Sequence, residues 1–264
     1  MLLNFINSPL EQFKINTLIS VNSPILDLST INFTSFGLYG ILVILTVLVV
    51  LGLGLDRKLI VGSNWLISIE ATVDTIVNMV KGQIGGTVYG RYVPLVYTLF
   101  IFILVANLIG MVPYNFAISA SIVFIISISL SLWIGLTVLG LYLHNLVFFS
   151  LFVPVGTPLA LVPLLVLIEL LSYSARAISL GLRLAANTLS GHLLMSILGN
   201  LVKNLMGISK ITFILGFLPL AGIFAIVILE FAIACIQAYV FAILTSSYLK
   251  AVSYTHLRAH ETLR

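Results

Sequence analysis

The sequence predicts an all-α polytopic membrane protein with about five membrane helices and one interfacial amphipathic helix. Of the 264 residues, 61% are hydrophobic and 8% are charged, and the mean hydropathy is +1.23. A soluble domain carries about a quarter charged residues. Several apolar stretches reach the length of about 20 residues that a helix needs to cross a bilayer. No soluble domain fits between them, so we predict a single membrane domain over residues 1–250.

Charge and cysteine content argue against several classes of function. The net charge of +4 is spread thinly along the chain, which argues against a nucleic-acid surface. The low charged fraction and the apolar stretches indicate the lipid bilayer as the surroundings. Cys235 is the only cysteine, which excludes an intrachain disulfide and a cysteine-based metal site, so we expect it in helix packing. No charged segment precedes the first apolar stretch, so no secretory signal peptide is expected. We predict no cofactor and no bound metal.

The N-terminal part of the chain predicts an arm followed by the first membrane helix. Residues 1–35 mix polar and apolar side chains with Pro9 and Pro24, which favours a short leader and an interfacial arm. Residues 37–55 form about a bilayer's length of uncharged sequence and predict the first membrane helix. The charged run 56–58 ends it.

Residues 63–81 change character and predict an amphipathic helix. Apolar and charged side chains fall on opposite faces at helical spacing, which is typical of a helix lying in the membrane interface. A helix packed on a soluble partner has the same pattern, but the flanking membrane helices favour the interface. The apolar face holds Trp65, Ile69, Val73, Ile76 and Val80, and the polar face holds Glu70, Asp74, Asn78 and Lys81.

Two further membrane helices are predicted over residues 94–112 and 118–143. Pro94 suits the first turn of the earlier helix, and Pro113 suits its end. Asn107 is polar within that helix. A hydrogen bond to another helix is the plainer interpretation of this residue, and lining a water path is the more specific one.

After a bent, proline-containing connection over residues 150–163, two apolar segments are too long for an ordinary membrane helix. They cover residues 164–202 and 211–250. A continuous helix of about 38 residues would rise about 57 Å, against about 30 Å of hydrocarbon. No proline falls between residues 164 and 218, so we predict two long, strongly tilted helices that form a hairpin joined near residues 203–210.

The segment 164–202 carries ionisable and polar groups at membrane depth. A charged group costs about 2.5–3.5 kcal/mol there on insertion scales, so each is a candidate for function. Glu169, Arg176 and Arg183 are spaced seven residues apart, nearly two helical turns, and therefore fall along one stripe, with Asn187 close to it. Small residues crowd the same segment, which lets another membrane helix approach closely.

The two arginines leave different alternatives open. Arg176 fits a side chain that reaches the interface, or a structural ion pair with Glu169, as well as it fits a functional role. Arg183 has at least ten largely apolar residues on either side, so it cannot easily reach an interface. The stripe indicates a surface that another membrane element meets or slides past.

One motif in this segment resembles a known family. The run Ser-Leu-Gly-Leu-Arg-Leu-Ala-Ala-Asn at 179–187, followed by Ser-Gly-His at 190–192, closely resembles subunit a of the rotary F-type ATP synthase in its mitochondrial form. The resemblance extends over roughly residues 8–250 and makes residues 1–7 a removed leader. It implies that the long hairpin curves around an oligomeric c-ring of small two-helix subunits. In the family, the arginine matched by Arg183 faces the proton-carrying carboxylate of that ring.

The last long segment adds further candidates for proton translocation. Glu230 and Gln237 lie seven apart on one face among alanines, although Glu230 also fits a structural acid paired with an arginine. His192 follows Arg183 by nine residues, half a turn out of phase, so we expect it to point away from the stripe, toward Glu230. An acid and an imidazole together form a plausible proton wire. In the family, residues matched by Glu230 and His192 line the entry half-channel, and the acid matched by Glu169 belongs to the exit half-channel.

The resemblance implies a location in the mitochondrial inner membrane, with the c-ring, the peripheral stalk and other Fo subunits as partners. It implies two proton half-channels separated by Arg183 and no catalysis in this chain, where nothing resembles a phosphate-cradling loop. Basic residues set the expected orientation, with the N-terminus in the intermembrane space and the C-terminus in the matrix. The loops after the first membrane helix hold Arg57, Lys58, Lys81 and Arg91, and the arm before it holds Lys14.

A proton-coupled secondary transporter, or a membrane subunit of a respiratory complex, is the alternative class. A transporter favours inverted repeats with helices broken at corresponding positions, and the sequence shows no such symmetry. Residues 253–264 have no apolar periodicity and no match in the family, so we expect this tail to be non-functional. Its His256 and His260 make a weak metal pair.

Overall fold

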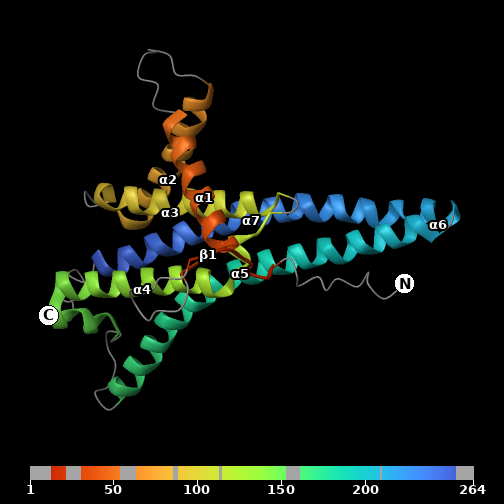
Figure 1. The fold of residues 1–264 in the computed structure, drawn as a ribbon. Coiled ribbons are helices and arrows are strands. Elements are labelled where there is room, and N and C mark those ends of the chain that lie inside the picture. The colour runs from red at the N-terminus through yellow and green to blue at the C-terminus, as the bar shows by residue number, and fades with distance from the viewer. Residues whose placement is uncertain are drawn as a thin grey trace. The chain divides into compact units, whose positions relative to one another are not determined.

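Helices dominate the structure, a computed structural model that describes residues 13–21, 31–53, 64–85, 89–112, 115–152, 161–208 and 210–253 (Figure 1). Within these ranges, five helices are long and apolar enough to cross a membrane, which confirms the predicted fold class. The α-helices are α1 (Ser35–Leu53), α2 (Asn64–Ile84), α3 (Tyr89–Gly110), α4 (Ile122–His144), α5 (Val162–Ile208), α6 (Lys210–Leu215) and α7 (Phe217–Ser253). Two 3-10 helices, η2 (Ile118–Ala120) and η3 (Asn145–Phe152), precede and follow α4.

The N-terminal arm contains a two-stranded ribbon that the sequence analysis did not anticipate. Strand β1 (Thr17–Val21) pairs antiparallel with β2 (Ile31–Thr34). Both strands are rich in β-branched residues, which favour extended backbone. A lone hairpin is marginal in stability, but this one is tied to α1, because the Ser35 amide donates to the Asn16 carbonyl at 2.9 Å.

Several predicted helix boundaries differ from those in the structure, and two of the differences have an identifiable cause. Helix α3 begins at Tyr89, so Pro94 lies inside the helix rather than at its start. Proline removes one backbone hydrogen bond there but does not end the helix. The second difference concerns the segment 211–250, where α6 and α7 are separated at Gly216. A Cβ atom at Gly216 would lie 2.8 Å from Cγ of Met206, so the close return of the chain requires glycine.

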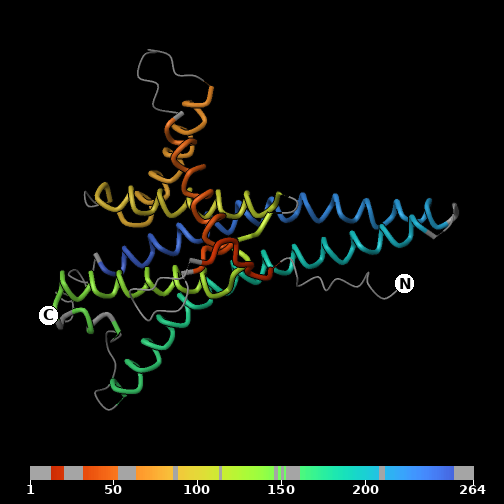
Figure 2. Tube along the Cα trace, viewed as in Figure 1, coloured from red at the N-terminus to blue at the C-terminus, as the bar shows by residue number. Residues whose placement is uncertain are grey.

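Helix α5 runs through 47 residues without interruption (Figure 2). At 1.5 Å per residue the length of this helix along its axis is about 70 Å. The hydrocarbon core of a bilayer is about 30 Å thick, which is less than half of that length. The absence of internal proline explains its continuity, as the sequence analysis expected. Helices α5 and α7 are accordingly the two long members of the predicted hairpin.

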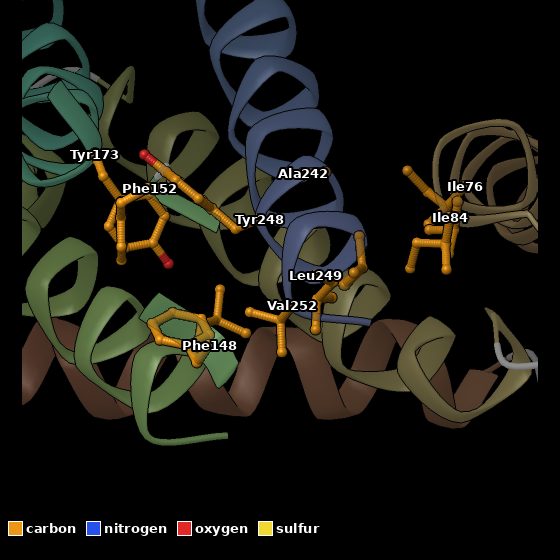
Figure 3. Packing of buried hydrophobic residues seen from close by; sticks show 12 residues of the cluster. Ile76, Ile84, Phe148, Phe152, Tyr173, Ala242, Tyr248, Leu249 and Val252 are labelled. Atoms are coloured by element: carbon orange, nitrogen blue, oxygen red, sulfur yellow. The ribbon is translucent and has the colours of Figure 1, made fainter. Parts of the chain in front are cut away.

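The chain divides into two compact units. Unit 1 comprises Met1–Gly52, Phe102–Ile122 and Leu184–Gln237, and unit 2 comprises Leu53–Ile101, Val123–Arg183 and Ala238–Arg264. The core of unit 2 collects apolar and aromatic side chains from α2, α4, η3, α5 and α7 (Figure 3). The C-terminal half of the apolar face of α2 enters this core through Ile76, Val80 and Ile84.

Candidate functional site

In unit 2, the stripe on α5 faces outward. Glu169, Arg176 and Arg183 are all exposed, while Tyr173, Ala177 and Leu180 on the other side of the helix are buried. Small exposed residues surround the stripe, namely Ser172, Ala175 and Ser179. The three charged side chains therefore remain available to a partner on this face.

The ion pair between Glu169 and Arg176, left open by the sequence, is not formed. Among the described residues, the ion-pair contact within 4 Å joins a different acid and base. Seven residues of helix separate the Cα atoms of Glu169 and Arg176 by about 10 Å along the axis, which explains why their side chains do not meet. Arg183 likewise makes no such contact with an acid in the described part of the chain.

Helix α4 packs closely against α5 just before Arg183. A Cβ atom at Gly181 would lie 3.1 Å from Cβ of Ser129 and 3.4 Å from the Ile125 carbonyl oxygen. Ser129 Oγ donates a hydrogen bond to the Ala177 carbonyl. The motif glycine at 181 therefore allows a close helix contact within unit 2, which fixes the turn of α5 that leads to Arg183.

In unit 1, α5 and α7 bring an imidazole and a carboxylate together. Nε2 of His192 lies 3.9 Å from Oε1 of Glu230, and their side chains are 15% and 8% exposed. Both carboxylate oxygens are buried and accept no hydrogen bond from the described residues. A buried ionised carboxylate without donors is costly, so this pair is suited to exchange a proton rather than to hold a fixed charge.

A small cavity in unit 1 gathers five of the polar residues that the sequence singled out. It offers about 10 Å³ to the centre of a water-sized sphere, about the minimum space for one water. Asn107 Nδ2 donates to the Ala234 carbonyl at 3.4 Å, and its Oδ1, like Oε1 of Gln237, has no partner among the described residues. Asn107 thus makes the expected interhelical hydrogen bond and also borders the cavity. The polar lining consists of Asn107, Asn187, Thr188, His192, Glu230 and Gln237.

Three contributors to this site were not identified from the sequence. Gly191 leaves space for the carboxylate, since a Cβ atom there would lie 2.8 Å from Cδ of Glu230. Thr188 Oγ1 donates to the Ser119 carbonyl at 3.0 Å and ties α5 to η2. The Phe13 ring packs edge-on against His192, with 6.3 Å between ring centroids. The glycine beside a polar motif residue was a usable signal, whereas nothing marked Phe13.

Other predicted features lie outside this cavity or outside the described residues. Glu169, Arg176 and Arg183 belong to unit 2 and do not line it. His256, His260 and the tail around them fall beyond the last described residue. No group of three His, Cys, Asp or Glu side chains that could hold a metal occurs within the described ranges.

Comparisons with known proteins agree with the family that the motif resembles. The family model described as ATP synthase A chain matches residues 37–250. "ATP synthase subunit a" of Pichia angusta is 75% identical over 96% of this chain and 99% of the relative. The proteins of the same name from Kluyveromyces lactis and Saccharomyces cerevisiae are 62% and 59% identical, each over 96% of this chain and over 98% and 97% of their own length. The chain therefore belongs to the ATP synthase A chain family.

Proposed function

We propose that this chain is the stator subunit that couples proton flow to ATP synthesis in the membrane sector of a rotary ATP synthase. The observation that carries this proposal is the cavity of unit 1, where an acid and an imidazole meet among amides inside an otherwise apolar protein. The proposal also needs a cation that a rotating partner can meet, and the stripe of α5 supplies one, Arg183, on an exposed face with small residues. Family membership supports the same conclusion.

The unit 1 cavity is the entry half-channel in this proposal. Glu230 receives a proton and passes it on with His192, because a carboxylate and an imidazole can each take up and release a proton. Their 3.9 Å separation exceeds a direct hydrogen bond, so the transfer runs through a bridging water. Asn107, Asn187 and Gln237 provide donors and acceptors that keep the path hydrated.

Arg183 is the residue that separates the two half-channels. Its guanidinium stays charged under essentially all conditions. A ring carboxylate that meets this cation is held in the ionised form and releases its proton toward the exit half-channel, to which Glu169 belongs. The same fixed charge repels a proton that would cross directly between the half-channels. Arg176, exposed on the same stripe, adds to the positive electrostatic potential around Arg183.

The chain has no nucleotide chemistry of its own in this proposal, and ATP is made by partner subunits. Its partners are the c-ring of two-helix subunits, the peripheral stalk, other Fo subunits and the lipid bilayer. The chain crosses the mitochondrial inner membrane several times, with the N-terminus in the intermembrane space and the C-terminus in the matrix.

Proton pumping by the assembled complex in vesicles tests the role of Glu230. Glu230→Gln removes the titratable proton but keeps the side-chain shape, so ATP-driven acidification should fall on the order of 100-fold, as for loss of a proton-transfer group. Glu230→Asp should retain more activity than Glu230→Gln. Glu70→Gln, on the exposed face of α2, is the matched control. Normal pumping by assembled Glu230→Gln would remove the proposed entry path.

A further inference from the structure

The core of unit 2 contains buried donors that the proposed proton path does not use. Trp133 of α4 packs on Tyr173 of α5, and Tyr173 packs on Tyr248 of α7, with centroid distances of 5.9 and 5.2 Å. Figure 3 shows Tyr173 and Tyr248 side by side. Tyr248 is 6% exposed. Nε1 of Trp133 and Oη of Tyr248 are shielded from solvent and have no hydrogen-bond partner among the described residues.

Trp133 and Tyr248, the residues that carry these donors, both line one small cavity between α4, α5 and α7. It offers about 10 Å³ to the centre of a water-sized sphere, about the minimum space for one water molecule. The remaining wall is largely apolar, from Leu132, Leu136, Leu180 and Phe241. A larger ligand does not fit, and no carboxylate lines the space.

Two hydroxyl oxygens complete the lining. Ser129 Oγ donates its hydrogen to the Ala177 carbonyl, and Thr245 Oγ1 donates to the Phe241 carbonyl at 2.8 Å. Each hydroxyl hydrogen is therefore committed, but each oxygen keeps the capacity to accept. The cavity thus presents two donors without acceptors and two acceptors with capacity to spare.

We propose that one ordered water molecule binds in this cavity. It accepts hydrogen bonds from Trp133 Nε1–H and Tyr248 Oη–H and donates to Ser129 Oγ and Thr245 Oγ1. This arrangement meets the two to four bonds that a buried water makes. It also gives each of the two buried donors the acceptor whose absence would destabilise the fold.

The water joins α4 to α7, and Ser129 of α4 is in turn bonded to the part of α5 that precedes Arg183. Ser129 of α4 contacts α5 at Ala177 and Gly181, Trp133 belongs to α4, and Tyr248 and Thr245 belong to α7. Because its ligands carry no titratable acid, the water is a structural ligand and not a proton station. Its role in holding the Arg183 turn rests on the proposed function, but its presence does not.

A cryo-EM map of the assembled complex, at a resolution that shows ordered waters, tests the site. We expect a density peak about 2.6–3.2 Å from both Trp133 Nε1 and Tyr248 Oη. Direct pairing of these two groups with protein acceptors, or a map without the peak, would overturn the proposal. Either result would leave the proton-pumping test of Glu230 unaffected.

Variants then identify the groups that hold the water. The double substitution Trp133→Phe with Tyr248→Phe removes both donors and should abolish the peak. Tyr142→Phe changes a residue of α4 that is 82% exposed and should leave it unchanged. A peak that persists in the double variant would show that other groups bind the water. The wild-type map decides the presence of the site even if the double variant does not assemble.

Discussion

The two units each enclose a cavity with space for about one water molecule, but the chemistry of the linings differs. In unit 1 the lining includes a carboxylate and an imidazole, Glu230 and His192, which change charge on protonation. In unit 2 the polar part of the lining consists of indole, phenol and aliphatic hydroxyl groups, which stay neutral. Both units thus bury polar groups. Titratable groups mark the candidate proton path in unit 1, and groups that do not titrate mark the structural contact in unit 2.

Helix α5 contributes to both units. In unit 2 its stripe of Glu169, Arg176 and Arg183 is exposed. In unit 1 its His192 lies beside Glu230 of α7. The same helix therefore supplies fixed charges to one unit and a titratable group to the other.

The largest expected effect comes from removing the outward charge. Arg183→Ala should lower coupled ATP synthesis by on the order of 100-fold, the scale of losing one partner of a desolvated charge pair, and should open a passive proton leak. Arg183→Lys should be a poor substitute, since an ammonium that the c-ring desolvates on assembly loses its charge more easily than a guanidinium. Synthesis and passive proton flux in vesicles measure both effects. Arg176→Lys is the milder control, and near-normal synthesis by assembled Arg183→Ala would refute the central role of this residue.

A pair of glycine substitutions contrasts the two units directly. Gly191→Ala would crowd the Glu230 carboxylate, and overpacking of this kind costs about 1–3 kcal/mol, so displacement of the carboxylate from His192 should lower proton flux. Gly181→Ala would instead press on Ser129 and the α4 backbone, so the loss should appear in the thermal stability of the complex. Equal effects of both variants on flux and on stability would contradict the division between a proton path and a structural contact.

A smaller effect is expected at the edge of the unit 1 cavity. Phe13 covers one side of His192, so Phe13→Ala should expose the imidazole and speed its modification by diethylpyrocarbonate, measured by mass spectrometry. We expect the rate of His192 modification to rise about threefold, which corresponds to less than about 1 kcal/mol of shielding by the Phe13 ring. Phe33→Ala, in a side chain that is 37% exposed on the ribbon, is the control. An unchanged modification rate would show that Phe13 does not shield the site.

No effect is expected from the C-terminal tail that follows α7. Truncation after residue 253, the end of α7, should leave assembly and proton pumping intact, because residues 254–264 carry no apolar periodicity. Blue-native electrophoresis and vesicle acidification measure the two properties. Loss of either one would assign the tail a role that its sequence does not suggest.

Several structural features were predictable from local sequence, and others were not. The alternation of faces in α2 and the uncharged length of α1 led to helices within a few residues of those observed. The start of α3 was predicted wrongly at Pro94, because this proline lies inside the helix, where it removes one backbone hydrogen bond but does not end the helix. The break before α7 falls at Gly216, an isolated glycine that a helix can also tolerate, so the sequence did not predict it; in the structure a Cβ atom there would meet Met206.

The sequence by itself determined the membrane class, the length of α5 and the spacing of its charged stripe, because apolar content and helical periodicity are local properties. Only the tertiary structure decided that Asn107, His192 and Glu230 border one cavity, and that Trp133 and Tyr248 border another. These contacts are made between helices that are far apart in the chain. They depend on which face each helix buries and on glycines such as Gly191 and Gly181 that allow close approach. Packing between helices sets both, and no single segment of sequence does.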